Sequence, residues 1–199
     1  MDDKRILGAV FALDLLGEKR SADVIAERLD SDVDKMESRL MELGRRGLLK
    51  QKGANVALTK QGREAIKVVF IGGGFEVIHS GHLYTIEQAR KRGDVLVVVV
   101  ARDSTLRRGK GREPVATEVE RVKLLSSLRQ VDAAILGVEG DIYETLEKVK
   151  PDVVALGYDQ RHAESDITRE AARRGIPLEV VRLDTPHPRI KTSRLLSEL

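Results

Sequence analysis

The hydrophobic pattern over residues 66–199 alternates between two kinds of segment. Short, almost uninterrupted apolar runs rich in valine alternate with longer segments whose apolar positions recur at helical spacing. Uninterrupted apolar runs are typical of strands buried on both faces of a parallel sheet. The predicted strands are 67–71, 95–101, 133–137, 152–157 and 178–183, and the predicted helices are 83–92, 118–128, 142–150 and 165–174. The pattern therefore predicts an α/β domain with a doubly wound parallel sheet, whose ligands bind at the carboxyl ends of the strands.

Residues 1–65 follow a helical period instead. Three helical segments come first, of which the second begins after Ser21 and the third spans about 32–43. Two short strand-like runs, 48–51 and 56–58, and a short helix after Thr59 complete this part. The order of these elements resembles that of the winged helix-turn-helix family. We therefore expect two domains, residues 1–65 and residues 66–199.

The winged helix-turn-helix resemblance raises DNA as a partner. A helix that reads DNA should begin with side chains that reach base edges and phosphates. The third predicted helix instead begins with Asp32, Asp34 and Glu37, which phosphates would repel. DNA binding is therefore possible but not favoured, and a dimerising, domain-docking or vestigial module is the preferred interpretation.

Composition narrows the class of protein. The 199 residues carry 35 basic and 32 acidic side chains, and the net charge of +3 is too small to indicate nucleic acid or membrane by itself. The sequence has no cysteine, which excludes a disulfide framework, a thiolate zinc site and a cysteine nucleophile. The longest apolar run, Val95 to Ala101, is too short to span a bilayer, and no secretory signal is readable at the start. We expect a soluble, cytoplasmic protein with no membrane partner.

The residues after the first predicted strand carry the candidate chemistry. A run of three glycines, Gly72 to Gly74, precedes the tetrad His79-Ser80-Gly81-His82, which opens a helix. Glycines let the backbone approach a ligand closely, and a helix N-terminus favours phosphate. Both histidines can face that phosphate from the first turn. The alternatives are two histidines without a ligand, and a metal site, which would need a carboxylate-rich set of further ligands that the sequence does not offer nearby.

This segment lacks the lysine of a P-loop and the G-x-G-x-x-G pattern of dinucleotide-binding domains. It resembles the HxGH signature of the cytidylyltransferase-like nucleotidyltransferases, which follows the first strand of a Rossmann-like domain. The resemblance implies that His79 and His82 are catalytic and also contact the nucleotide. The other residues of this segment that it implies to bind the nucleotide are Gly73, Gly74, Phe75 and Gly81.

The resemblance extends to basic residues further along the chain. The family carries a basic loop after its second strand, and here this loop is 107–114, with Lys110 as a catalytic and Arg112 as a nucleotide-binding residue. Its glycines would let it close as a lid over the β- and γ-phosphates, or it is a mobile surface loop. Arg121 matches a catalytic helix arginine that reaches the same phosphates, with a surface ion pair as the alternative.

Other positions of the family's pattern are matched less completely. The remaining residues that the resemblance implies to bind the nucleotide are Asp103, Gly157, Tyr158, Asp159, Thr192 and Ser193. The hydroxyls of the last two would hold phosphate, although helix capping alone would also explain them. The family usually has Thr or Ser at position 74 and often Asp at position 76, where this chain has Gly74 and Glu76.

Residues 67–199 look most like the archaeal FAD synthetases, which implies AMP transfer from ATP to FMN with release of pyrophosphate. The acceptor phosphate is already an anion near neutral pH, so the site must supply alignment and positive charge rather than a general base. The resemblance also implies Mg²⁺, held mainly by substrate phosphates and not by a protein metal site, and a homodimer. Two alternatives stay open: a CTP-dependent cytidylyltransferase acting on glycerol 3-phosphate or a similar small phosphate, and a winged-helix regulator that senses a nucleotide or flavin.

Overall fold

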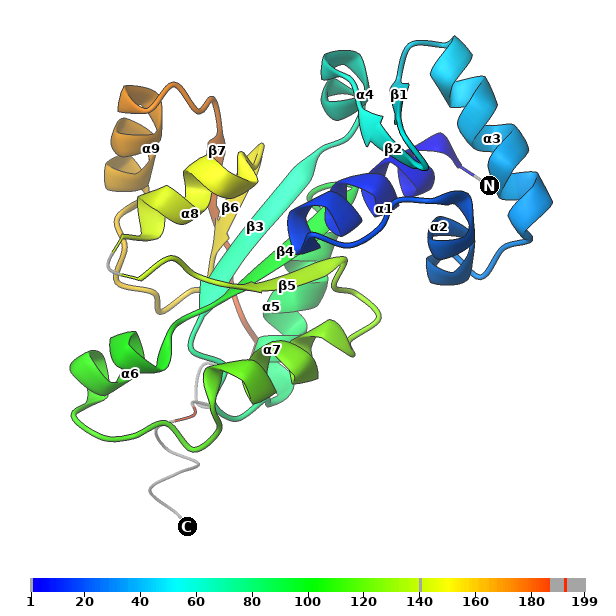
Figure 1. Ribbon diagram of the computed structural model, residues 1–199. Helices are drawn as coiled ribbons and strands as arrows, with labels where there is room; N and C mark the ends of the chain where they lie inside the picture. The colour runs from blue at the N-terminus through cyan, green and yellow to red at the C-terminus, as the bar shows by residue number, and fades with distance from the viewer. Residues whose placement is uncertain (1, 140, 187–191, 193–199) are drawn as a thin grey trace. The chain divides into compact units, whose positions relative to one another are not determined.

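A computed structural model of the protein describes residues 2–139, 141–186 and 192 (Figure 1). Contacts between Cα atoms divide the chain into two compact units, Met1–Lys67 and Val68–Leu199. Each unit has its own buried apolar residues, and we describe the two units separately.

The first unit is a small bundle of helices with a β-hairpin. Its elements are α1 (Asp3–Leu16), α2 (Ala22–Arg28), α3 (Val33–Arg45), β1 (Leu49–Lys52), β2 (Asn55–Leu58) and α4 (Lys60–Glu64). The side chains of Asp2, Asp32 and Thr59 accept hydrogen bonds from backbone N–H groups and so cap α1, α3 and α4. Strands β1 and β2 pair antiparallel, from Leu49 opposite Leu58 to Lys52 opposite Asn55.

The second unit is an α/β domain, as the sequence predicts. Its strands are β3 (Val68–Gly73), β4 (Val95–Val100), β5 (Ala133–Leu136), β6 (Val153–Leu156) and β7 (Glu179–Arg182). Its helices are α5 (Ser80–Arg90), α6 (Asp103–Lys110), α7 (Glu118–Ser126), α8 (Ile142–Val149) and α9 (Glu164–Arg173). The five strands are all parallel and lie in the order β5-β4-β3-β6-β7. The strand order therefore reverses between β3 and β6, which is where open α/β sheets bind their ligands.

Alternating side chains of the strands divide the sheet into two faces. One face carries Val69 and Ile71 of β3 and Val98 of β4, and it joins one buried cluster with Ile86 of α5 and Leu125 of α7. Helices α8 and α9 belong to the other face, where the side chains of Phe70, Val99 and Val154 point. Figure 1 shows these two helices together on one side of the sheet and α5 with α7 on the other.

One element of this unit was not predicted. The segment after β4 was expected to be a basic loop from residue 107, but α6 extends as far as Lys110 and ends at Gly111, which has a φ of +69°. Only Leu106 of this helix is buried, so the helix has no apolar stripe that would reveal it in the sequence. The irregular basic segment is therefore shorter than expected. In the part of the chain that the structure describes, no helix is both long enough and apolar enough to cross a bilayer.

Candidate active site

The glycine turn at the end of β3 is the centre of the candidate site. Gly72 and Gly73 still belong to the strand and pair with Val99 and Val100 of β4, and the chain then turns towards α5. Phe75 in this turn has a φ of +50°, a left-handed conformation that is uncommon for a residue with a side chain. Its ring is buried and contacts His82, with ring centroids 5.2 Å apart. Such local strain is typical of functional turns, and here it brings an aromatic ring against a candidate catalytic imidazole.

The structure brings the two histidines of the tetrad together. His79 occupies the N-cap position of α5 and His82 lies in its first turn. Their rings are stacked, with centroids 3.9 Å apart and planes inclined by 26°. Both imidazoles therefore lie at the positive end of the helix dipole, where a phosphate group is favoured.

Both imidazoles are neutral at pH 7 in this environment. Burial, together with the charge of the neighbouring His79, lowers the pKa of His82 to about 4. Burial also lowers the pKa of His79, while the charge of Asp159 opposes this shift. The Nδ1 atoms of both rings are buried without a hydrogen-bond partner among the described residues. Unpartnered buried polar atoms are costly, and a ligand that offers partners would remove that cost.

Gln160 joins the two strands at which the strand order reverses. Its side-chain amide donates to the carbonyl of Gly72 at 2.5 Å, and its amide oxygen accepts from the N–H of Gly157 at 3.0 Å. The turn after β6, which contains Tyr158 and Asp159, is thereby held beside the glycine turn. The charge of Asp159 acts on both histidines. The glycine turn and the turn after β6, which are far apart in the sequence, therefore lie together at one edge of the sheet. Both were expected to bind the nucleotide.

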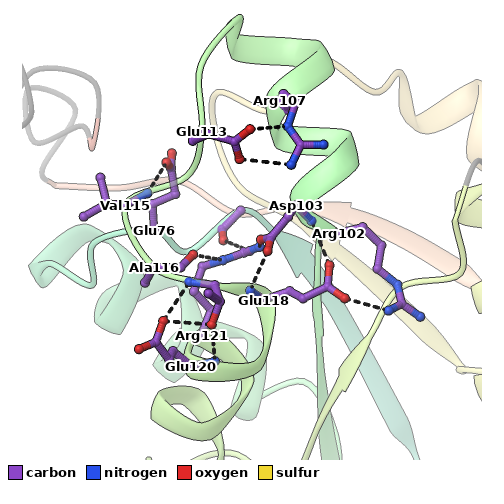
Figure 2. A network of polar contacts seen from close by, with 12 residues as sticks. Glu76, Arg102, Asp103, Arg107, Glu113, Val115, Ala116, Glu118, Glu120 and Arg121 are labelled. Carbon is purple, nitrogen blue, oxygen red and sulfur yellow. Dashed lines mark hydrogen bonds and ion pairs between the residues drawn. The ribbon is translucent and has the colours of Figure 1, made fainter.

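Arg121 and Asp103 have different contacts from those expected. Arg121 was expected to reach phosphate, but its side chain is only 1% exposed and binds three protein oxygens. It donates to the carbonyls of Gly74 at 2.5 Å and Ala116 at 3.1 Å, and to Asp103 Oδ1 at 2.5 Å (Figure 2). Asp103 Oδ2 also accepts from the N–H of Glu118. Arg121 therefore holds the glycine turn through the carbonyl of Gly74, and Asp103 holds Arg121 in place, while the nucleotide contacts expected of both residues stay predictions.

A second ion cluster contains Lys110 and Arg112. Both side chains bind the carboxylate of Glu76, Arg112 Nη1 at 2.9 Å from Glu76 Oε1 and Lys110 through a short contact to Oε2. Burial opposes ionisation of Glu76, but hydrogen bonds and charges from the two cations outweigh it and lower its pKa. The charge of Lys110 also acts on His82. The structure thus brings the two predicted phosphate-binding cations together on Glu76, close enough to the histidines for the charge of Lys110 to act on His82.

Position 74, where the family usually has a hydroxyl residue, is a glycine that lies against the side chain of Leu106. A Cβ atom at Gly74 would lie 2.9 Å from the Cδ2 atom of Leu106, so the leucine of α6 fills the space of a side chain there. At Gly73 a Cβ would lie 2.9 Å from the ring of Phe75. Of the two C-terminal hydroxyl residues that were expected to bind phosphate, Thr192 is helical and half-buried, and Ser193 lies outside the described residues.

A cavity of about 360 Å³ reaches the glycine turn from the face of the sheet that bears α8 and α9. Its floor is apolar and includes Phe70, Val99 and Leu156, while Arg102 and Arg108 lie at its polar side. Gly72 to Gly74 line this cavity and also lead into the tetrad, so the cavity adjoins the turn that precedes the N-terminus of α5.

The chain belongs to the cytidylyltransferase-like family, whose model matches residues 70–196. This match confirms the predicted class, a nucleotidyltransferase with a Rossmann-like domain. The match begins inside β3, so it does not include the first unit.

Comparison with individual proteins shows which nucleotidyltransferases this chain resembles. The FAD synthase of Aciduliprofundum boonei is 48% identical over 115 residues, which are 58% of this chain and 76% of that protein. The FAD synthase of Thermococcus onnurineus is 39% identical over 145 residues, 71% of this chain and 96% of that protein. A solved structure, the lipopolysaccharide core biosynthesis protein of Thermoplasma volcanium, is 43% identical with a TM-score of 0.57 and covers 59% of this chain and 96% of its own. The protein is thus an enzyme whose relatives are FAD synthases.

Two residues of the site were not singled out as functional from the sequence: Leu106 and, as a partner of the cations, Glu76. Glu76 had been noted only as a departure from the family's usual aspartate. Its position within the glycine-to-histidine turn was the available signal, because a carboxylate in a phosphate site needs a cation beside it. Leu106 carried no comparable signal, since its role depends on the contact between α6 and the glycine turn. Gln160 belongs to the turn that was expected at the nucleotide base, but its bond to Gly72 could not be predicted from the sequence.

Proposed function

We propose that this protein transfers the adenylyl group of ATP to FMN, giving FAD and pyrophosphate. The observation that carries the proposal is the stacked pair His79 and His82 at the N-terminus of α5, in a chain whose relatives are FAD synthases. A phosphate oxygen of FMN attacks the α-phosphorus of ATP, and the bond from that phosphorus to the bridging oxygen of pyrophosphate breaks. No proton has to be removed from the attacking group, so catalysis rests on alignment and on neutralising charge.

The residues of the site can supply both the alignment and the positive charge that this reaction needs. The imidazoles of His79 and His82 and the N–H groups of the first turn of α5 act on the α-phosphate. Lys110 and Arg112 act on the β- and γ-phosphates, which leave as pyrophosphate. The turn of Gly157, Tyr158 and Asp159 binds the nucleotide base and ribose. Arg121 is a positioning residue in this scheme, because it holds the carbonyl of Gly74.

We assign the cavity on the α8 and α9 face to FMN. A flavin ring is flat and largely apolar, which matches the floor of Phe70, Val99 and Leu156, and a phosphate is an anion, which suits Arg108 at the polar side. From this cavity the FMN phosphate reaches the glycine turn, where the α-phosphate of ATP would lie. The two reacting groups would then meet at the glycine turn, at the carboxyl end of β3.

Mg²⁺ belongs to the proposal as a companion of ATP. Among the described residues no group of three or more histidine, aspartate or glutamate side chains could hold a metal ion. The nearby carboxylates Glu76 and Asp103 are each bound to cationic side chains. This donor set fits an ion that is held by the phosphates of the nucleotide, where it would neutralise part of their charge.

For the first unit we propose a winged helix-turn-helix module that docks or dimerises rather than reads DNA. Helix α3 begins with an acidic first turn, and its Val33 and Met41 side chains are 42% and 65% exposed, which suits a protein partner. The proposal includes a homodimer and a cytoplasmic location. Sedimentation of the chain with and without residues 1–67 tests the dimer, and salt-dependent binding to duplex DNA would overturn the docking role.

The test of the proposed function is pyrophosphate release with Mg²⁺ across a grid of ATP or CTP against FMN or glycerol 3-phosphate. We expect release with ATP and FMN together and not with the other combinations. His82→Ala should reduce turnover by about two to three orders of magnitude and change ATP affinity by less than about tenfold, because the imidazole acts mainly on the transition state. Release with CTP and glycerol 3-phosphate would replace the proposal by cytidylyl transfer. Nucleotide or flavin binding without any release would indicate a sensor.

A further inference from the structure

The carboxylate of Glu76 is an unexpected group in a site for a polyanion. Its side chain is completely buried, whereas those of Lys110 and Arg112 are 36% and 41% exposed. A buried carboxylate next to a triphosphate would weaken binding by repulsion unless it does something else for the site. It lies only three residues before His79, so its position is fixed by the same turn that presents the histidines.

Glu76 organises the irregular segment between α6 and α7. Its two oxygens accept from Lys110 at the end of α6, from Arg112, and from the N–H of Val115 at 3.4 Å (Figure 2 draws this last bond). One carboxylate thus binds three points within six residues of chain. Glu113, by contrast, points away and pairs with Arg107 in an exposed ion pair. Glu76 is therefore the group that sets where the two cations lie.

The two cations keep donors after they have bound Glu76. An ammonium group has three N–H donors and a guanidinium group has five. Within the described part of the chain, Lys110 uses its ammonium group on Glu76 alone, and Arg112 uses Nη1 on Glu76 and on the carbonyl of Glu113 and Nη2 on Glu76. Further N–H groups of both side chains remain for a ligand. The three side chains together carry one net positive charge, so the cluster still attracts an anion.

We propose that Glu76 is a positioning residue for triphosphate binding: its buried carboxylate holds Lys110 and Arg112 beside the histidines in a geometry that leaves N–H donors for the β- and γ-phosphates. The inference rests on the proposed function and specifies how its phosphate-binding cations are held. Glu76 itself does not touch the nucleotide. The competing interpretation is that Glu76 occupies the cations in place of the triphosphate and so opposes binding, and the two interpretations predict opposite effects of removing its charge.

Binding of ATP and of inorganic tripolyphosphate, measured by calorimetry, distinguishes them. Glu76→Gln keeps the shape of the side chain and removes its charge, and we expect it to weaken both ligands by about ten- to a hundredfold, because the cations are no longer fixed. Glu76→Asp keeps the charge and should restore most of the affinity. Glu113→Gln is the matched control in the same segment and should leave binding unchanged, since its carboxylate pairs away from the site.

A double-mutant cycle tests whether Glu76 acts through the two cations. In a Lys110→Met/Arg112→Met background we expect Glu76→Gln to have no further effect on ATP affinity, because the groups it positions are gone. An undiminished effect in that background would overturn the proposal in favour of a general structural role. Unchanged or tighter binding by Glu76→Gln in the otherwise native chain would overturn it as well, and so would a native chain that binds neither ligand. If the native chain binds ATP but releases no pyrophosphate with FMN, only the proposed function fails, because binding alone decides the role of Glu76.

Discussion

Two ion clusters flank the glycine turn, and they differ in how completely their cations are used. In the Arg121 cluster the guanidinium is buried and its donors bind a carboxylate and two carbonyls. In the Glu76 cluster the anion is the buried member, and the cations Lys110 and Arg112 remain more than one third exposed. The first arrangement fixes the backbone of the turn, whereas the second leaves positive charge exposed, which in the proposed function binds the triphosphate. The comparison teaches that burial of the cation, rather than its proximity to the site, separates support from binding.

The largest expected effect is the loss of stability in Arg121→Met. This change leaves the carboxylate of Asp103 and the carbonyl of Gly74 without their partner, and breaking a buried pair in this way costs about 3–5 kcal/mol. Urea unfolding followed by circular dichroism measures it. The control is Arg107→Met, which breaks an exposed ion pair and should produce no measurable change. Equal stability of the two variants would contradict the supporting role of Arg121.

A smaller loss of stability is expected on lowering the pH, and it comes from His82. The histidines differ from both ion clusters because they carry no charge in the free protein. The pKa of His82 falls from 6.5 to about 4 on folding, so between these values the unfolded chain binds a proton that the folded chain does not. Stability must therefore decrease as pH falls from about 6.5 to about 4, and by pH 5 the loss amounts to about 2 kcal/mol. Denaturant unfolding of the native chain and of His82→Gln at pH 7.5 and pH 5 measures it. Parallel pH dependence in the two proteins would show that His82 is not buried as a neutral group.

The smallest effect on stability is expected for Lys110→Met. Lys110 is partly exposed, and Glu76 keeps its bonds from Arg112 and Val115, so the loss should stay below about 1 kcal/mol. Tripolyphosphate binding should nevertheless weaken by about tenfold, since one of the two cations held by Glu76 is gone. The same urea and calorimetry measurements apply. A variant that loses stability as Arg121→Met does, but retains its ligand affinity, would remove the distinction between the two clusters.

The sequence was sufficient to predict the sheet of the second unit. Each of the five predicted strands is present, because valine-rich runs such as 95–100 have few alternatives to burial in a parallel sheet. Helix α6 was missed because seven of its eight residues are not buried, which left no periodic signal. The tetrad was found because its residues are contiguous. Their positions at the start of α5 follow directly from the turn that precedes them.

The contacts of the charged residues could not be predicted in the same way. Glu76 and Lys110 are 34 positions apart, and Arg121 is 47 positions from Gly74. An arginine in a polar helix is usually at the surface, and only the packing of α7 against the sheet buries Arg121. The bonds of Arg121 to Gly74 and Asp103 therefore could not be predicted from the sequence, and the nucleotide contacts expected of Arg121 and Asp103 stay predictions. Position along the chain indicates which residues lie near the site, and tertiary packing decides which way their side chains point.

The contact between Gly74 and Leu106 implies that these two positions should change together in evolution. A Cβ at position 74 would lie 2.9 Å from the Cδ2 atom of Leu106, so a side chain at position 74 requires the end of the leucine side chain to shift. A relative with threonine at the position of Gly74 therefore needs a different leucine rotamer, a smaller residue or a displaced helix at the position of Leu106. In a library that randomises both positions, selection should favour a small residue at one position when the residue at the other is large. The size of the residue at position 74 is thus coupled to the size of the residue at position 106, and Gly74 is more than the loss of a hydroxyl group.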